Sequence, residues 1–213
     1  MNTTGVIMAS GEGSRLRLVT QRLGLPKHLL PLGQTSSVAL IVQELKKCCN
    51  QIILVCGRDE KNIFEDTILK IDNNVEIIPK EDPGFSGDYA IAHKHAQNEH
   101  IVLTVGDIVF KKNELTRIIK TSQANFPKFT LVFDRHQIIS HLDFRMVAAS
   151  TDKKMLQMIM QINPESFKEV SLNFLRFFLQ NKVRASLAEV LFNLNTPESY
   201  DLAKKYFETL NYK

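Results

Sequence analysis

Short apolar runs alternate with longer segments of mixed polarity along the first 125 residues of the chain. The apolar runs lack a regular polar alternation, which is typical of strands buried on both faces of a sheet. They predict strands at residues 5–9, 51–56, 75–78 and 101–105, and apolar stretches farther along the chain predict strands at 129–133, 145–149 and 187–192. The longer segments predict helices at residues 36–49, 62–71, 87–97, 113–122, 153–162, 166–179 and 197–210.

Two of these helices carry clear start signals. Ser36 or Ser37 can cap the first one, and Thr196 followed by Pro197 opens the last. The alternation of strand and helix predicts an α/β fold, a three-layer α/β/α sandwich around a mostly parallel, mixed sheet. No linker-like tract and no internal repeat interrupts the chain, so we expect one domain over residues 1–213, in which the less regular part is 126–186.

Composition narrows the function classes. With 44% hydrophobic and 23% charged residues among 213, the chain can build a core without disulfides, so disordered and disulfide-scaffold classes are excluded. The net charge of +4 is evenly spread, which does not indicate a nucleic-acid partner but is compatible with phosphate-bearing small substrates. No apolar run is long enough for a membrane span and no signal peptide is evident. Three cysteines without a CxxC pair predict reduced thiols in the cytoplasm.

A glycine-rich loop follows the first predicted strand, in the stretch MASGEGSRLR. Gly11 and Gly13 allow a tight turn that brings backbone amides close to an anion, and Arg15 adds a charged fork suited to phosphate. Leu16 stands where a dinucleotide fingerprint needs its third glycine, and the GK[ST] end of a Walker A loop is absent. The loop is therefore a candidate triphosphate cradle, with a plain strand-to-helix turn as the alternative.

Three further motifs carry candidate chemistry. In LGLPKHLLPLG, Pro26 forces an extended turn before Lys27, a point charge suited to phosphate. In TVGDIVF, Asp107 follows a strand at the end where α/β sheets bind ligands, and a carboxylate there suits Mg²⁺. In FNLNTPESY, Asn193 ends a strand and its amide oxygen is a candidate second metal ligand. An ordinary surface lysine and a turn-forming aspartate are the alternatives for Lys27 and Asp107.

The order GVIMASGEGSRL, PKHLLPLG, GDIVF and NLNTPES resembles the nucleotidyltransferase family with the glycosyltransferase-A-type, Rossmann-like fold. This group contains sugar-1-phosphate nucleotidylyltransferases, phosphocholine cytidylyltransferases, the methylerythritol-phosphate cytidylyltransferase and the molybdopterin guanylyltransferases. The four motifs extend over nearly the whole chain. The resemblance implies transfer of a nucleoside monophosphate group from a triphosphate to a phosphorylated small-molecule acceptor, with release of pyrophosphate and dependence on Mg²⁺.

The resemblance also implies residue roles. The catalytic residues would be Arg15, Lys27 and Asp107, with Mg²⁺ held by Asp107 and Asn193. The nucleotide would be bound by residues of the first loop and of a second loop beside the base and ribose, namely Ala9, Ser10, Gly11, Gly13, Arg15, Gly87 and Asp88. The acceptor would bind in the part formed by residues 126–186.

The chain departs from the family pattern at two of these positions. Ser10 replaces the glycine that commonly precedes the loop, and Asn193 stands where sugar-type members commonly have aspartate. The front half resembles the branch acting on sugar phosphates and phospho-alcohols such as phosphocholine, whereas the back half resembles the molybdopterin branch. A molybdopterin guanylyl- or cytidylyltransferase, a catalytically weak nucleotide-binding regulator and an unrelated α/β enzyme are the alternative interpretations.

Overall fold

The computed structural model describes residues 1–81, 85–126, 130–136, 146–161 and 184–211. Its strands are β1 (Thr3–Ala9), β2 (Gln51–Gly57), β3 (Val75–Lys80), β4 (His100–Val105), β5 (Ile108–Phe110), β6 (Thr130–Asp134), β7 (Met146–Thr151), β8 (Arg184–Ala188) and β9 (Val190–Asn193). Its helices are α1 (Arg17–Leu23), α2 (Ser37–Leu45), α3 (Lys61–Ile68), α4 (Phe85–His95), α5 (Glu114–Asn125), α7 (Lys153–Gln161) and α9 (Pro197–Asn211). The helix expected at 166–179 lies outside the described residues.

The main sheet has seven strands in the order β3-β2-β1-β4-β7-β6-β8. Strands β3, β2, β1 and β4 are mutually parallel, and β6 is parallel to β8, while β7 runs antiparallel to both of its neighbours. The expected mostly parallel, mixed sheet is thus confirmed. Strands β2 and β3 are added on one side of β1, and β4 is added on the other side. The order of the strands therefore reverses between β1 and β4. Ligands of open α/β sheets bind at the carboxyl ends of strands beside such a point.

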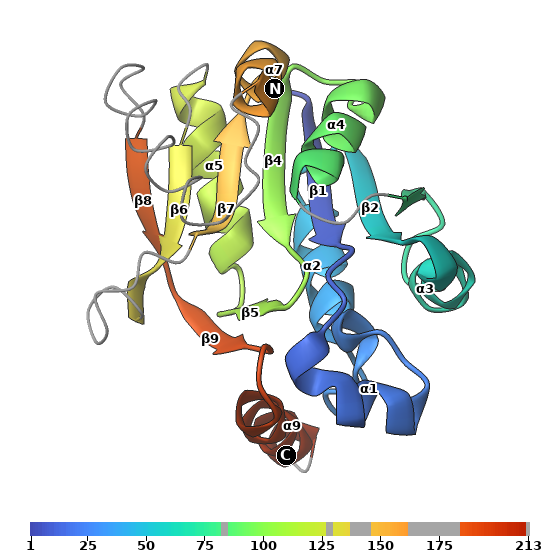
Figure 1. The fold of residues 1–213 in the computed structure, drawn as a ribbon. Coiled ribbons are helices and arrows are strands. Elements are labelled where there is room, and N and C mark those ends of the chain that lie inside the picture. Colours follow the sequence, from blue (N-terminus) through green and yellow to red (C-terminus); the bar gives the residue numbers. More distant parts are fainter. Residues whose placement is uncertain (82–84, 127–129, 137–145, 162–183, 212–213) are drawn as a thin grey trace.

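Helices cover both faces of this sheet, which confirms the three-layer architecture (Figure 1). One face is packed by α2, α3 and α5, whose buried residues include Val42, Phe64 and Ile119. The other is packed by α4 and α7 through side chains such as Ala92 and Leu156. Because each central strand is buried on both sides, its sequence is continuously apolar rather than alternating.

A small second sheet, formed by antiparallel β5 and β9, lies beyond the carboxyl end of β4 together with α1 and α9 (Figure 1). A separate apolar cluster joins these elements to the chain before α2, and the Tyr200 hydroxyl donates a hydrogen bond of 3.1 Å to the carbonyl of Pro31. The single strand expected at 187–192 is in fact divided between β8 in the main sheet and β9 in the small one. The division carries the chain from the edge of the main sheet to the region beyond β4.

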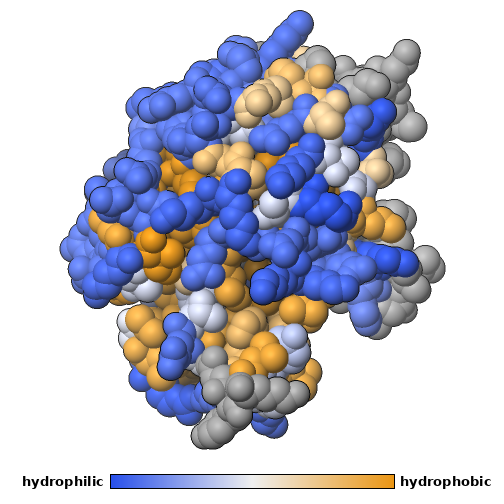
Figure 2. Space-filling view, turned by 180° about the vertical axis from the view of Figure 1, so that it is seen from behind, coloured by the Kyte–Doolittle hydropathy of each residue, from blue (hydrophilic) through white to orange (hydrophobic). Residues whose placement is uncertain are grey.

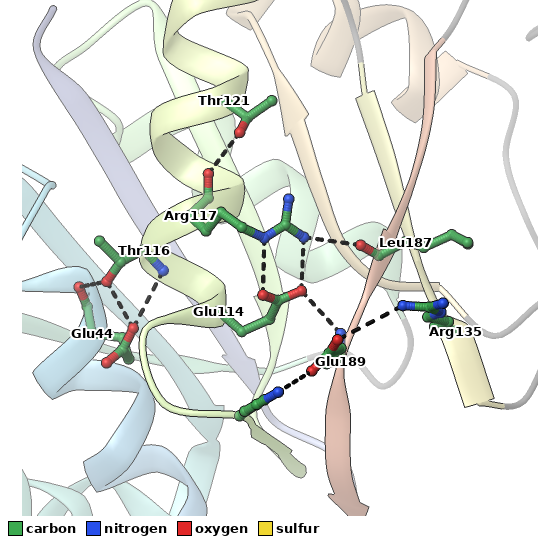
Figure 3. A network of polar contacts seen from close by, with 9 residues as sticks. Glu44, Glu114, Thr116, Arg117, Thr121, Arg135, Leu187 and Glu189 are labelled. Atoms are coloured by element: carbon green, nitrogen blue, oxygen red, sulfur yellow. Dashed lines mark hydrogen bonds and ion pairs between the residues drawn. The ribbon is translucent and has the colours of Figure 1, made fainter.

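A network of charged groups fixes that division (Figure 3). The Glu114 carboxylate accepts hydrogen bonds from Arg117, at 2.7 and 2.9 Å, and from the backbone N–H of Glu189, at 2.9 Å. Arg117 also donates to the Leu187 carbonyl at 3.1 Å, and the Glu189 carboxylate is 2.6 Å from Lys111 Nζ. These contacts tie the start of α5 to the junction of β8 and β9, and β9 carries Asn193.

Exposed apolar side chains are found on the two helices beyond the small sheet. Leu18 of α1 is 85% exposed, and Leu202 and Leu210 of α9 are 61% and 50% exposed. Hydrophobic colour gathers at the lower end of the molecule in Figure 2, where Figure 1 places these helices. None of the helices in the described ranges has the length and apolar character needed to cross a membrane.

His100 is buried in a polar network at the opposite end of the sheet from α1 and α9. Its Nδ1 lies 2.9 Å from the Thr3 hydroxyl, and its Nε2 lies 3.1 Å from the hydroxyls of both Ser122 and Ser150. Burial lowers the pKa of His100 to about 4 from an ordinary value of 6.5. The folded protein therefore binds a proton here less readily than the unfolded chain does.

We expect this histidine to make stability fall as the medium is acidified. A group whose pKa is lowered in the folded state favours folding above its unfolded pKa, and that contribution is lost between about pH 6.5 and pH 4. The thermal unfolding midpoint should fall by about 5 °C or more between pH 7 and pH 5. In His100→Gln the fall should be smaller, whereas His93→Gln, at a partly exposed position on α4, should behave like the wild type. Equal pH dependence in all three proteins would contradict this role.

Candidate active site

A cleft opens at the carboxyl ends of β1 and β4 and has two adjacent chambers. The large chamber, about 550 Å³, is lined by the glycine-rich loop, Lys27, the β4–β5 connection, Met146 and the β9–α9 connection. The small chamber, about 190 Å³, is lined mainly by Ser10, His28, Lys80 and Asp88. Both are also lined by Gly11, Glu12, Lys27, Val105 and Asp107, so the two chambers of the cleft lie side by side.

Most of the site residues expected from sequence line this cleft. The large chamber contains Gly11, Gly13, Arg15, Lys27, Asp107 and Asn193, and the small chamber contains Ser10 and Asp88. The remaining two lie beside it: Ala9 is fully buried at the end of β1, and Gly87 is in the first turn of α4. Their roles in nucleotide binding stay predictions.

Lys27 crosses the large chamber to reach Asp107. Its Nζ lies 2.7 Å from Asp107 Oδ2 and 3.3 Å from Asn195 Oδ1, and the Lys27 side chain is only 11% exposed. Pro26 is extended, at φ −56° and ψ 148°, and the 3₁₀ turn 27–29 follows directly. The turn expected at this proline thus aims the lysine into the cleft rather than at solvent.

The glycines of the first loop leave the space that Lys27 occupies. Gly13 has φ +64°, which L side chains rarely adopt, and a Cβ added there would lie 3.1 Å from Cβ and Cδ of Lys27. A Cβ at Gly11 would lie 3.4 Å from Lys27 Nζ. The loop is therefore shaped around the lysine stem as well as being open toward an anion.

Asp107 is held by backbone contacts on both sides. The backbone N–H of Gly106 donates to the Met8 carbonyl at 2.9 Å, and the Ser37 hydroxyl donates to the Gly106 carbonyl at 2.7 Å. The backbone N–H of Leu194 donates to the Asp107 carbonyl at 2.8 Å, which joins the β9–α9 connection to this turn. The Asp107 carboxylate consequently has a fixed position between Lys27 and the asparagines that follow β9.

Asn195 is a site residue that the sequence analysis missed. Its side-chain oxygen faces Lys27, while its side-chain Nδ2 donates to the amide oxygen of Asn193. Its backbone N–H also donates to the Asn193 carbonyl at 2.9 Å. The alternation in Asn193-Leu194-Asn195, with a buried leucine between two cleft asparagines, is the signal that could have revealed it.

Arg15 differs from the other cations of the cleft because it is exposed. It lines the large chamber from the 3₁₀ turn 14–16, and within the described ranges it makes no hydrogen bond or ion pair with another side chain. A planar guanidinium in this position can present two parallel N–H donors to a phosphate.

His28 lies under the floor of the cleft as a neutral group. It is 2% exposed, and its Nδ1 is the buried side-chain atom without a hydrogen-bond partner in the described residues. Burial, together with the charge of neighbouring Lys27, lowers the pKa of His28 to about 3. A Cβ at Gly106 would lie 3.1 Å from its ring carbon Cδ2, so glycine at 106 allows the ring to approach the Asp107 turn.

A second ion pair lies in the small chamber. Asp88 Oδ1 accepts a hydrogen bond of 2.9 Å from the Ser10 hydroxyl and lies 3.0 Å from Lys80 Nζ. Both charged side chains are almost fully buried, and burial raises the pKa of Asp88. Lys80 was not expected from sequence because a lysine at the end of a strand is usually exposed. The pair joins β3 to α4 beside the end of β1.

The oxygen atoms around Lys27 suit a divalent cation of the Mg²⁺ type. Asp107 Oδ2 and Asn195 Oδ1 converge on one cationic nitrogen, so their lone pairs face a common point. Within the described parts of the chain, no group of three or more His, Cys, Asp or Glu side chains could hold a metal. Mg²⁺ commonly binds through one or two carboxylates, waters and substrate phosphates, so one carboxylate with amide oxygens fits such a site.

Residues 5–162 match the family model of the MobA-like NTP transferase domain, which covers more than half of the chain. The chain belongs to the MobA-like NTP transferase family. This match confirms the nucleotidyltransferase family that the motifs predicted.

Other relatives of this MobA-like NTP transferase agree with that placement. The bifunctional protein GlmU of Methanococcus aeolicus is 23% identical over 180 residues, which are 84% of this chain and 40% of the relative. The chain thus spans about two fifths of the length of that curated relative.

Solved structures share the fold. The 4-diphosphocytidyl-2C-methyl-D-erythritol synthase of Anaerococcus prevotii superposes with a TM-score of 0.72 at 19% identity, covering 97% of this chain and 96% of the other. UTP-bound UGPase of Acinetobacter baumannii superposes with a TM-score of 0.73 at 14% identity, covering 97% and 93%.

Proposed function

We propose that this protein transfers a nucleoside monophosphate group from a nucleoside triphosphate to a phosphate-bearing small molecule, a sugar-1-phosphate or a phospho-alcohol such as phosphocholine, in a Mg²⁺-dependent reaction. The observation that carries the proposal is the convergence of Lys27, Asp107 and Asn195 in a cleft that is also lined by the glycine-rich loop and Arg15. The structural relatives named for UTP and for a diphosphocytidyl product support the reaction class.

The two chambers suggest how the substrates are arranged. The small chamber is lined by Asp88, which follows the glycine expected beside the base and ribose, and by Ser10 of the first loop. We assign the nucleoside to this chamber. The triphosphate then extends along the glycine-rich loop into the large chamber, toward Arg15 and Lys27. The acceptor enters the large chamber from the opposite side, near Met146 and Asn193.

The reaction requires little proton chemistry. An acceptor phosphate with a second pKa of about 6 is mostly dianionic at neutral pH, so no general base is needed. One of its oxygens forms a bond to the α-phosphorus as the bond from that phosphorus to the bridging oxygen of the β-phosphate breaks. Pyrophosphate leaves with the electron pair of the broken bond.

The main barrier is the approach of two polyanions. Arg15 binds and orients phosphate oxygens through the two parallel N–H donors of its guanidinium. Lys27 supplies a positive charge on a flexible side chain, which can stay in contact with the phosphates during the reaction. Asp107, with the amide oxygens of Asn193 and Asn195, would hold Mg²⁺, which would neutralise phosphate charge. Because these groups stand in fixed places around the cleft, catalysis is mostly positioning and electrostatic stabilisation.

Arg15 gives a prediction specific to triphosphate binding. Arg15→Ala should raise KM for the triphosphate about tenfold or more, and Arg15→Lys should raise it less, because lysine keeps the charge but loses the fork. Arg17→Ala is the matched control, since Arg17 is exposed on α1 and lines neither chamber. Steady-state kinetics with varied triphosphate would measure this, and equal KM values in all four proteins would contradict the cradle.

The proposal as a whole is tested by a screen for pyrophosphate release. CTP, GTP, UTP, ATP and dTTP are each combined with sugar-1-phosphates, phosphocholine, polyol phosphates and molybdopterin, with Mg²⁺. At least one pair should release pyrophosphate only when both substrates are present. Selection of molybdopterin would identify the alternative acceptor class. Nucleotide binding without release from any pair would instead support a regulatory protein on this fold.

A further inference from the structure

We infer that Lys27 is a tethered cation that occupies the divalent-metal position of the nucleotide-free protein and leaves it when the triphosphate binds. The inference rests on the proposed function, because it concerns the cation of that reaction. Its basis is that Lys27 Nζ makes a contact of 2.7 Å with Asp107 Oδ2 and one of 3.3 Å with Asn195 Oδ1. These are the oxygens to which a metal at this position would be bound.

An ammonium group and a divalent cation compete here. Each weakens the binding of the other to the same carboxylate oxygen, because their mutual repulsion cancels part of the attraction of that oxygen. Among the described residues, Asp107 supplies the carboxylate that contacts Lys27, and Asn193 and Asn195 add only neutral oxygens. Without nucleotide, the tethered ammonium therefore has the advantage over a free metal ion, which must also lose part of its hydration.

The position of the lysine allows it to change partners. Its flexible four-carbon stem lies against Gly13, and its nitrogen lies beside Gly11 as well as beside Asp107. The same nitrogen is thus at the edge of the loop to which the triphosphate is assigned. Incoming phosphates provide Lys27 with new anionic partners and provide the metal with additional oxygen ligands.

This exchange predicts that metal and triphosphate bind cooperatively. Each ligand removes an obstacle to the other, and the coupling is equal in both directions by thermodynamic linkage. The metal alone should bind weakly to the nucleotide-free protein, and removal of the lysine charge should relieve that weakness.

Direct binding of Mn²⁺, followed by the electron paramagnetic resonance of the free ion, tests this without turnover. In Lys27→Met, which keeps an unbranched stem against Gly13, the affinity of the nucleotide-free protein for Mn²⁺ should rise about tenfold or more. Arg15→Met removes a positive charge from the same chamber but not from Asp107, and should raise it no more than about threefold. The gain should disappear in the double variant Lys27→Met, Asp107→Asn. Unchanged affinity in Lys27→Met, or an equal gain in Arg15→Met, would overturn the inference.

A measurement on the wild-type protein does not depend on how any variant folds. The side-chain nitrogen of Lys27, observed by NMR after ¹⁵N-lysine labelling, should keep its resonance when millimolar Mg²⁺ is added alone. It should shift when a non-hydrolysable triphosphate is added with Mg²⁺. A full shift with Mg²⁺ alone would show that the metal displaces the lysine unaided and would contradict the inference.

These outcomes are separable from those of the pyrophosphate screen. If no substrate pair releases pyrophosphate but Lys27→Met gains Asp107-dependent Mn²⁺ affinity, the proposed function fails and the cation exchange stands. If pyrophosphate is released and Lys27→Met gains no affinity, the proposed function stands and the exchange is wrong.

Discussion

Asp107→Asn is expected to lower kcat by about a hundredfold or more, the scale of losing one group that stabilises developing charge. The change keeps the size of the side chain. It removes the negative charge of the carboxylate that, together with Asn195, contacts Lys27 Nζ. Backbone hydrogen bonds at Gly106 and Asp107 hold this turn, so the fold should be retained. Circular dichroism and thermal unfolding would establish that it is, and kcat at saturating substrates and Mg²⁺ measures the effect.

The neighbouring asparagine provides the matched comparison. Asn193→Ala should reduce the rate less than Asp107→Asn, because a neutral amide oxygen contributes less than a carboxylate to a hard cation. Asn193→Asp should preserve or tighten metal binding. Normal turnover in Asp107→Asn together with complete loss in Asn193→Ala would show that the principal ligand has been misassigned. Full activity of both variants in EDTA would contradict metal dependence itself.

Lys27→Met should also lower kcat by about a hundredfold or more, because the cleft loses the ammonium group that stabilises the negative charge of the phosphates. The fold should persist, since the methionine stem can still fill the space beside Gly13. Lys204→Met is the control, because Lys204 is exposed on α9 and lines neither chamber. Steady-state kinetics would measure both proteins.

A rate in Lys27→Met close to that of the wild type would contradict a catalytic role for this lysine. Lys27→Arg distinguishes charge from shape. The planar guanidinium is larger than the ammonium group that fits between Gly11, Asp107 and Asn195, so this variant should recover only a minor part of the lost rate.

Much of the central fold could be predicted from the sequence, because strands that are buried on both faces are continuously apolar. The apolar runs in β1, β2 and β4 carried that signal, and Ser36, whose hydroxyl accepts from the backbone N–H of Ala39 at 3.3 Å, marked the start of α2. Elements without a clear hydrophobic pattern were missed. Helix α1 has no buried residue, and β5 has only three residues, so neither produces a periodic pattern.

The junction of β8 and β9 was missed for a different reason. The break at Glu189 is made by its backbone bond to the Glu114 carboxylate, 75 residues away along the chain, and a local pattern cannot contain that contact. Candidate site residues within sequence motifs were easier to predict. Arg15, Lys27 and Asp107 lie in loops with recognisable motifs, and the structure brings all three to the large chamber.

Residues that belong to the cleft only because of their side-chain contacts could not be predicted. Lys80 is unremarkable in sequence and becomes part of the cleft through its ion pair with Asp88. Asn195 resembles an ordinary residue before a helix cap until its oxygen is found facing Lys27. Lys27 and Asn195 are 168 residues apart, and Lys80 and Asp88, although 8 residues apart, lie on different elements. Spacing within one motif encodes neither contact.

The fate of the α-phosphate tests the central claim most directly. The protein is incubated with [α-³²P]-labelled triphosphates, the acceptor panel and Mg²⁺, and the products are separated by chromatography. The account predicts that the label appears in a nucleoside diphosphate joined to the acceptor, with unlabelled pyrophosphate formed in equal amount and only when acceptor is present. Label found in free nucleoside mono- or diphosphate, formed at the same rate without acceptor, would contradict it.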